Sequence, residues 1–154
     1  MRKTDYLRKI NELMLHNKFL ESESLIFDII RSYEEPWLYY YLGVAQIELN
    51  KFDHGIDNLL RSIFLDKDFD LKNARNILAK IYMQNSQFSL AEKFLKESIA
   101  IDKNLTTYLN LINTLINLGK KEEAYNFLEV LKKEFIKTID SKELKFLEKK
   151  ISLL

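Results

Sequence analysis

Four short turns divide this 154-residue sequence into repeats, and their spacing limits the folds that the chain can adopt. Each turn has a small or turn-prone residue, then a polar residue and usually a phenylalanine: Asn17-Lys18-Phe19, Asn50-Lys51-Phe52, Ser86-Gln87-Phe88 and Gly119-Lys120-Lys121. The first residues of successive turns are 33, 36 and 33 positions apart. A fixed period of this length is typical of solenoids, in which stacked units bury one another.

The segments between these turns have helical periodicity, and none alternates like a β-strand. Asp, Ser and Asn residues precede the apolar segments, and Pro36 stands where the first turn of a helix tolerates proline. The pattern predicts nine helices, at 4–16, 19–32, 36–49, 53–66, 71–85, 88–101, 105–118, 121–136 and 141–152. The predicted fold class is therefore all-α, a right-handed α-solenoid of stacked antiparallel helix hairpins.

The second repeat carries the features of a known repeat family. It has Leu42-Gly43, then Asn50 at the turn between helices, Phe52, and Gly55 at a small-residue site. In these positions the chain resembles the tetratricopeptide repeat (TPR) family, whose units of about 34 residues alternate small and large apolar positions over two helices. The resemblance extends over nearly the whole chain as a single TPR-like domain, with repeats at about 3–35, 36–69, 72–104 and 105–138. The family's closing proline and its tryptophan are missing from these units.

Five small residues are predicted to mark the points where paired helices cross: Gly43, Gly55, Ala79, Ala91 and Ala124. Two antiparallel helices approach closely only where one presents a small side chain to a large one on the other. We therefore expect all five to be buried between helices.

The carboxy-terminal segment is predicted to be a capping helix at 141–152. Asp140-Ser141-Lys142-Glu143 has the pattern of a capping box, and Leu144, Leu147 and Ile151 form one apolar stripe. A terminal helix of this kind covers the open end of a solenoid. Phe146 and Leu153 lie off the stripe, which leaves contact with a second copy, as in a homodimer, open.

Composition argues against an enzyme. The chain has no cysteine and only three isolated glycines, and its formal charge is +1. His16 and His54 lack further ligands at metal-binding spacing, and His54 with Asp53 and Asp57 is expected to be an exposed helix start. No metal site or cofactor is expected, nucleic acid is an improbable partner, and the absence of a signal pattern or a membrane span favours a cytoplasmic protein.

The resemblance implies a non-catalytic adaptor or scaffold that holds a protein or peptide in a concave groove lined by the first helix of each repeat. Its groove positions fall on Trp37, Tyr40, Val44 and Ile47 in the second repeat, on Asn73, Asn76, Lys80, Met83 and Gln84 in the third, and on Thr106, Asn110, Asn113 and Asn117 in the fourth. Asparagine side chains both donate and accept hydrogen bonds. We expect an apolar side chain of the partner at Trp37 and Tyr40, and its backbone at the asparagines.

Two alternatives belong to other classes of function. The length and helix number are similar to those of the TPR chaperones of type III secretion, but the first repeat begins almost at Met1, without the longer helical arm that would favour this alternative. The last repeat also resembles a pentatricopeptide repeat, a family that binds RNA. Leu109 stands at its base-reading position and cannot read a base edge, so RNA binding is the minor alternative.

Overall fold

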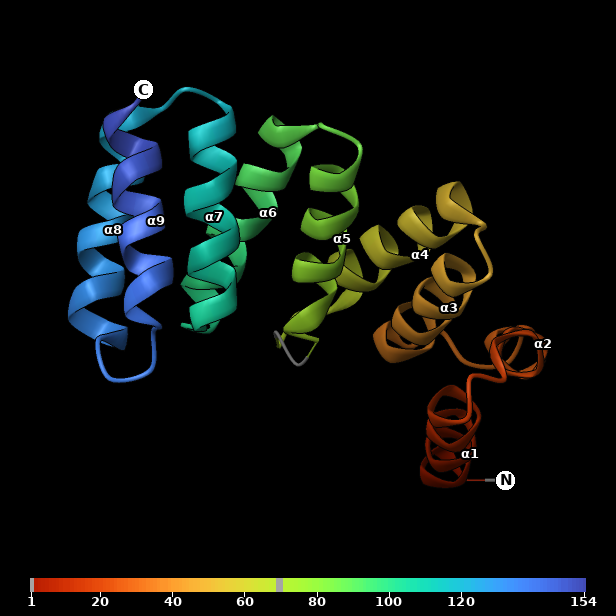
Figure 1. Ribbon diagram of the computed structural model, residues 1–154. Helices are drawn as coiled ribbons and strands as arrows, with labels where there is room; N and C mark the ends of the chain where they lie inside the picture. Colours follow the sequence, from red (N-terminus) through yellow and green to blue (C-terminus); the bar gives the residue numbers. More distant parts are fainter. Residues whose placement is uncertain (1, 69–70) are drawn as a thin grey trace. The chain divides into compact units, whose positions relative to one another are not determined.

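The computed structural model describes residues 2–68 and 71–154. Within these residues the chain forms nine α-helices joined by short turns, and no β-strand (Figure 1). The helices are α1 (Lys3–Leu15), α2 (Phe19–Ile30), α3 (Pro36–Glu48), α4 (Phe52–Leu65), α5 (Asn73–Gln84), α6 (Phe88–Ile101), α7 (Leu105–Asn117), α8 (Lys121–Phe135) and α9 (Ser141–Ser152). The predicted all-α class of stacked helix hairpins is confirmed.

The predicted helix bounds differ from the observed ones by at most two residues. The two larger differences are at the end of α2 and the start of α5. The helix α2 ends at Ile30, two residues before the predicted end, and the chain becomes extended at Glu35, with φ −124° and ψ 140°, because Pro36 follows it. The helix α5 begins at Asn73 rather than at 71, because the Leu71 N–H donates to the Asp66 carboxylate at 2.9 Å in the preceding turn.

The four turns identified in the sequence have the same backbone structure. Their first residues have positive φ angles: 56° at Asn17, 59° at Asn50, 56° at Ser86 and 70° at Gly119. The next residue donates its N–H to a carbonyl five positions earlier, from Lys18 to Leu13, Lys51 to Gln46 and Gln87 to Tyr82 at 2.8 Å, and from Lys120 to Leu115 at 2.9 Å. These are Schellman motifs, which end a helix with one left-handed residue. The regular spacing of the turns in the sequence therefore corresponds to a backbone conformation that recurs at each of them.

Two helices approach each other closely within the hairpin of α3 and α4. Gly43 and Gly55 are both buried there, and a Cβ atom added to Gly43 would lie 2.9 Å from the Gly55 carbonyl oxygen. The other three predicted small sites, Ala79, Ala91 and Ala124, are fully buried. The predicted burial is confirmed at all five positions, and the predicted close approach of two helices is confirmed at Gly43 and Gly55.

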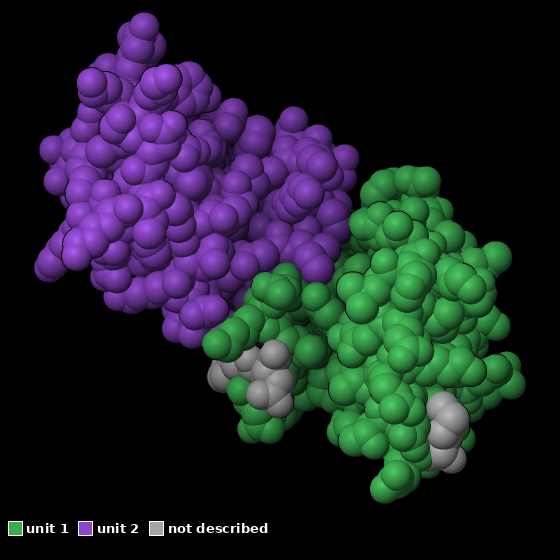
Figure 2. All heavy atoms as spheres, turned by 60° about the horizontal axis from the view of Figure 1, so that its bottom comes forward, with its two compact units in different colours: residues 1–74 green, residues 75–154 purple. Residues whose placement is uncertain are grey.

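The chain divides into two compact units, residues 1–74 and residues 75–154 (Figure 2). The division falls in the first turn of α5, close to the start of the third predicted repeat. The single domain and its four repeats stay a prediction, and the predicted repeat boundary at Phe69 lies outside the described residues. We describe the units separately, as unit 1 and unit 2.

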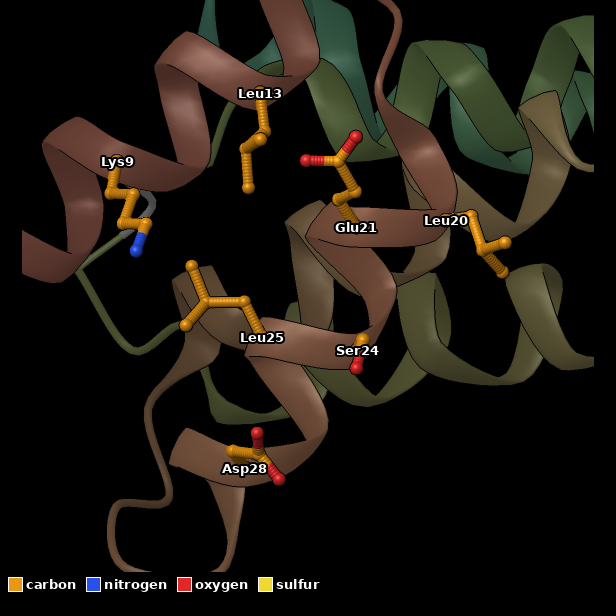
Figure 3. Close-up of a pocket in the computed structure, with 7 residues that line it drawn as sticks. All are labelled: Lys9, Leu13, Leu20, Glu21, Ser24, Leu25 and Asp28. Carbon is orange, nitrogen blue, oxygen red and sulfur yellow. The ribbon is translucent and has the colours of Figure 1, made fainter.

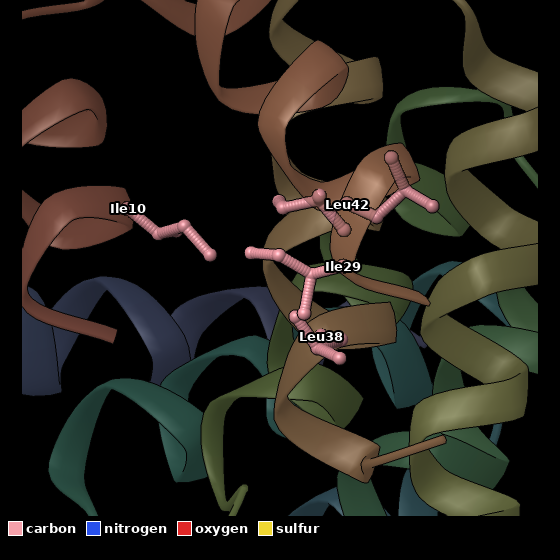
Figure 4. Close-up of a cluster of buried hydrophobic side chains, with 5 residues drawn as sticks. Ile10, Ile29, Leu38 and Leu42 are labelled. Atoms are coloured by element: carbon pink, nitrogen blue, oxygen red, sulfur yellow. The ribbon is translucent and has the colours of Figure 1, made fainter. Parts of the chain in front are cut away.

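The core of unit 1 lies between its hairpins. Its buried side chains are Ile10 from α1, Ile26 and Ile29 from α2, and Leu38 and Leu42 from α3 (Figure 4). A single hairpin cannot bury its own apolar face, so α3 of the second hairpin completes the core of the first. This is the packing that the repeat pattern predicts.

In unit 2 the helix α7 is central, because it packs against α6, α8 and α9. Its residues Leu111, Ile112 and Leu115 are fully buried. The helix α9 packs against both α7 and α8 and buries Leu147 and Ile151, two residues of its predicted stripe. Its start is capped by the Asp140 side chain, which accepts the Lys142 N–H at 3.1 Å, although α9 lacks the reciprocal half of the predicted capping box.

Candidate functional site

The predicted ligand-binding residues fall in both units. Trp37, Tyr40, Val44, Ile47 and Asn73 belong to unit 1, whereas Asn76, Lys80, Met83, Gln84, Thr106, Asn110, Asn113 and Asn117 belong to unit 2. In unit 2 they come from α5 and α7, which lie side by side since the Thr107 hydroxyl donates to the Asn76 side-chain oxygen at 3.3 Å. We call the surface formed by the unit 2 residues the amide face.

The asparagines of α7 form a ladder along one side of the helix. The side-chain nitrogen of Asn113 donates to the Leu109 carbonyl at 3.0 Å, and that of Asn117 donates to the Asn113 carbonyl at 2.8 Å. Asn110 and Asn113 are half-buried, and Asn117 is exposed. Because one N–H of Asn113 and one of Asn117 bond to their own helix, each of these side chains keeps its acceptor oxygen and its second N–H for a partner.

The amide face contains no acidic residue. From Asn73 to Gln84 and from Leu105 to Asn117, the only charged side chains are those of Arg75 and Lys80. Arg75 is buried and binds Glu97 at 3.2 Å, whereas Lys80 and Gln84 are exposed. The free charge on this face is therefore that of one lysine, and the other side chains that define it are uncharged.

In unit 1, two of the four groove residues already have partners in the fold. Trp37 packs against the core cluster, and its buried indole nitrogen has no hydrogen-bond partner among the described residues. Ile47 fills the space over Gly55, since a Cβ there would lie 2.6 Å from Ile47 Cδ1. Tyr40 and Val44 are half-buried, and the Tyr40 ring meets the Tyr41 ring edge-on at 5.2 Å. Burial of Tyr40, and to a lesser degree the neighbouring Tyr41, raises the pKa of its hydroxyl.

Buried carboxylates joined to turn lysines were missed by the sequence reasoning. In unit 1, Glu23 of α2 binds Lys51 at 2.6 Å and accepts from Gln46 at 3.1 Å. In unit 2, Glu92 of α6 binds Lys96 at 2.6 Å and Lys120 at 2.9 Å. Glu23 lies five residues after Lys18, and Glu92 lies five residues after Gln87, the second residue of the turn in each repeat. Aligning the repeats therefore places the two glutamates at the same position.

The environment of Glu92 alters its protonation. Burial alone would raise the pKa of this carboxyl, but the hydrogen bonds and charges of Lys96 and Lys120 outweigh burial and lower it below 4.5. Glu23 behaves in the same way, with Lys51 and Gln46 as its donors. Each carboxylate joins a helix to the next hairpin of its unit, so these clusters stabilise the fold.

Replacing Glu92 by glutamine is expected to lower the free energy of unfolding by about 1–3 kcal/mol at pH 7. Because the pKa in the folded protein lies below its unfolded value, the stabilisation is present above about pH 4.5 and is lost as the pH falls through the folded-state pKa. Urea denaturation at pH 7 and pH 3.5 should therefore show a smaller difference from the wild type in acid. The exposed Glu122→Gln is the control, and equal stability of wild type and Glu92→Gln at pH 7 would contradict the role of this cluster.

Neither histidine forms part of a cluster of metal ligands. His16 is exposed and its Nδ1 lies 2.7 Å from the Glu12 carbonyl, and His54 is exposed at the start of α4. Among residues 2–68 and 71–154 there is no group of three or more His, Cys, Asp or Glu side chains that could hold a metal ion. Across the same residues, no helix combines the length and the apolar character needed to span a bilayer.

Comparisons with solved structures identify a TPR-like fold. MamA of AMB-1 superposes with a TM-score of 0.74 at 19% identity, over 97% of this chain and 82% of that one. A MamA double mutant of RS-1 gives 0.72 at 12% identity, over 97% and 92%. The nearly identical TPR-like repeats of a kinesin light chain from Podosopora anserina give 0.70 at 15% identity, over 97% and 86%. The sequence matches no protein-family model and has no significant match among curated proteins. The predicted resemblance to TPR arrays is confirmed for the fold.

Proposed function

We propose that this protein is a non-catalytic adaptor whose amide face binds an extended segment of another protein. The observation that carries the proposal is the asparagine ladder on α7, a helix with no charged residue between Leu105 and Asn117. Side chains that neither pack in the core nor carry charge are available to bind a neutral polar group, and the peptide backbone is such a group. The TPR-like fold supports a role in protein interaction.

The spacing of the ladder suits an extended peptide. Asn113 and Asn117 are four residues apart, which corresponds to about 6 Å along the helix axis. In an extended chain the N–H groups on one side recur every second residue, at about 6.6 Å. Two acceptor oxygens at this separation can therefore receive two such N–H groups of one strand.

The charge of the amide face favours neutral or acidic segments. Lys80 is its one exposed charged side chain, and it can bind a carboxylate of the ligand, while the exposed Gln84 can donate to a backbone carbonyl. Tyr40 and Val44 of unit 1, both half-buried, are proposed separately as contacts for an apolar side chain of a partner, because aromatic side chains often contribute much of the binding energy.

A peptide-display selection on the wild-type protein, followed by affinity measurements on variants, tests the proposal. The variant Asn113→Ala/Asn117→Ala should weaken binding of the selected peptides about 30-fold, because two hydrogen bonds of about 1 kcal/mol each are lost. Alanine is the better helix former, so the variant should stay folded. The control is Asn126→Ala, an exposed asparagine on α8. Equal binding by both variants would contradict the proposed face.

A further inference from the structure

A groove between α1 and α2 lies open at the first hairpin. It has a volume of about 440 Å³ and is lined by Lys9, Leu13, Leu20, Glu21, Ser24, Leu25 and Asp28 (Figure 3). Figure 3 shows Leu13 of α1 and Leu25 of α2 pointing into the space between the two helices. Lys9 lies on α1 with Leu13, across this space from the residues of α2. A second hollow of about 320 Å³ shares Lys9 and Leu13 and reaches His16 and Lys18. We call the first of these the N-terminal groove.

Later hairpins show that this edge of a repeat accepts a helix. The Leu13 carbonyl accepts the N–H of the Schellman turn that follows α1. The carbonyls of Gln46 and Leu115 accept the same hydrogen bond in the turns after α3 and α7. Gln46 and Leu115 are only 3% and 0% exposed, whereas Leu13 is half-buried. In those hairpins a preceding helix packs alongside, α2 on α3 in unit 1 and α6 on α7 in unit 2. The corresponding edge of the first hairpin, in contrast, forms the open N-terminal groove.

The α2 bank of the N-terminal groove is apolar and acidic. Its apolar side chains are Leu20, which is 64% exposed, and the half-buried Leu25; Phe27, seven residues after Leu20 and 45% exposed, lies outside the lining. Beside them stand Glu21 and Asp28, also seven residues apart and exposed. Glu21 has one ion-pair contact, 3.5 Å from the exposed Lys18 of the adjoining turn. This bank therefore offers two apolar side chains flanked by two carboxylates.

The outer side of α9 has the complementary pattern. Phe146 and Leu153, seven residues apart, are 55% and 77% exposed. Lys142 and Lys149, also seven residues apart, are exposed and fall on the same side of the helix, opposite the buried Leu147 and Ile151. On both α2 and α9 the spacing corresponds to about 10.5 Å along the helix.

We propose that the outer side of α9 of one copy docks in the N-terminal groove of a second copy. Phe146 and Leu153 pack against the leucines of the groove, while Lys142 and Lys149 pair with Glu21 and Asp28. The contact joins two different surfaces, so it is head-to-tail, and each pair keeps one free N-terminal groove and one free α9. Association therefore continues beyond the dimer as the concentration rises. This inference does not depend on peptide binding at the amide face.

Sedimentation velocity over a range of concentration and salt tests the proposal on the full chain. The average mass of the wild type should rise with concentration and fall with added salt, because charged pairs contribute. Two charge-reversal variants, Glu21→Lys/Asp28→Lys and Lys142→Glu/Lys149→Glu, should each need a concentration more than 10-fold higher to associate. The exposed-site control Asp57→Lys/Lys133→Glu should associate like the wild type.

Mixing the two charge-reversal variants distinguishes a head-to-tail contact from a symmetric one. The first variant keeps a native α9, the second keeps a native groove, and their two exchanged surfaces also match each other. The mixture should therefore associate and grow with concentration as the wild type does, whereas a closed symmetric pair would stop at the dimer. The variant with all four substitutions should associate again, because the charges of both surfaces are exchanged.

The variant Phe146→Ala/Leu153→Ala tests the apolar contacts without changing any charge. It should weaken association and leave the melting temperature unaltered. A wild type that stays monomeric up to millimolar concentration, or a mixture that stays monomeric, would overturn the proposal.

Discussion

Replacing Gly43 by alanine is expected to destabilise unit 1 by about 2–3 kcal/mol, although alanine favours a helix over glycine by about 1 kcal/mol. A Cβ atom at Gly43 would lie 2.8 Å from Leu59 Cγ, 2.9 Å from the Gly55 carbonyl oxygen and 3.0 Å from the Leu59 backbone nitrogen. Two of these atoms belong to the backbone of α4, so the helices themselves must move apart. At Gly55 the closest atom is the flexible end of Ile47, at 2.6 Å, so Gly55→Ala should cost less and Gly55→Leu more.

Urea denaturation measures this loss by circular dichroism and by the fluorescence of Trp37, the single tryptophan of the chain, which lies in unit 1. Ala91→Leu is the corresponding change in unit 2, where Ala91 is fully buried, and should also destabilise. Gly119→Asn is the control: asparagine stands at the equivalent Asn17 and Asn50, and a Cβ at Gly119 would have no atom within 4 Å. Unchanged midpoints in Gly43→Ala and Gly55→Leu would mean that the helices do not cross at these glycines.

Removing residues 141–154 is expected to cost unit 2 about 3–6 kcal/mol, because two fully buried aliphatic side chains contribute about 1.5–3 kcal/mol each. Leu147 and Ile151 of α9 are 1% and 3% exposed, and they cover α7 and α8. The truncated protein should melt at a lower temperature and aggregate, since the surface that α9 covers becomes exposed.

A double variant tests whether the buried side chains of α9 stabilise unit 2 when the helix itself is kept. Leu147→Ala/Ile151→Ala keeps the helix and removes its two anchors, so it should lower the melting temperature nearly as much as the truncation. Phe146→Ala, at a residue 55% exposed, should leave the melting temperature unchanged. A monomeric truncation with an unaltered melting temperature would show that α9 does not stabilise the end of unit 2.

The sequence patterns did not predict which side chains that are far apart along the chain form pairs. Glu23 and Lys51, like Glu92 and Lys120, are 28 residues apart, and their pairing depends on how one hairpin lies against the next. The pattern of α3 predicted an apolar groove stripe at Trp37, Tyr40, Val44 and Ile47. A helix apolar on nearly every side gives no indication of which side faces the core, and packing placed Trp37 on the core cluster and Ile47 over Gly55.

What the sequence by itself determined is local. The left-handed residue of each Schellman turn, the residue before Pro36 and the small side chains at Gly43 or Ala91 act within a few bonds or within one hairpin, so their chemistry specifies the turns, helix ends and crossings. Only the tertiary structure decided which surfaces each hairpin covers. It divided the chain into two units, buried Glu23 and Glu92 beneath lysines, and left the N-terminal groove and the outer side of α9 exposed. Burial and ion pairing depend on distances between helices, and those distances result from the packing of many side chains at once.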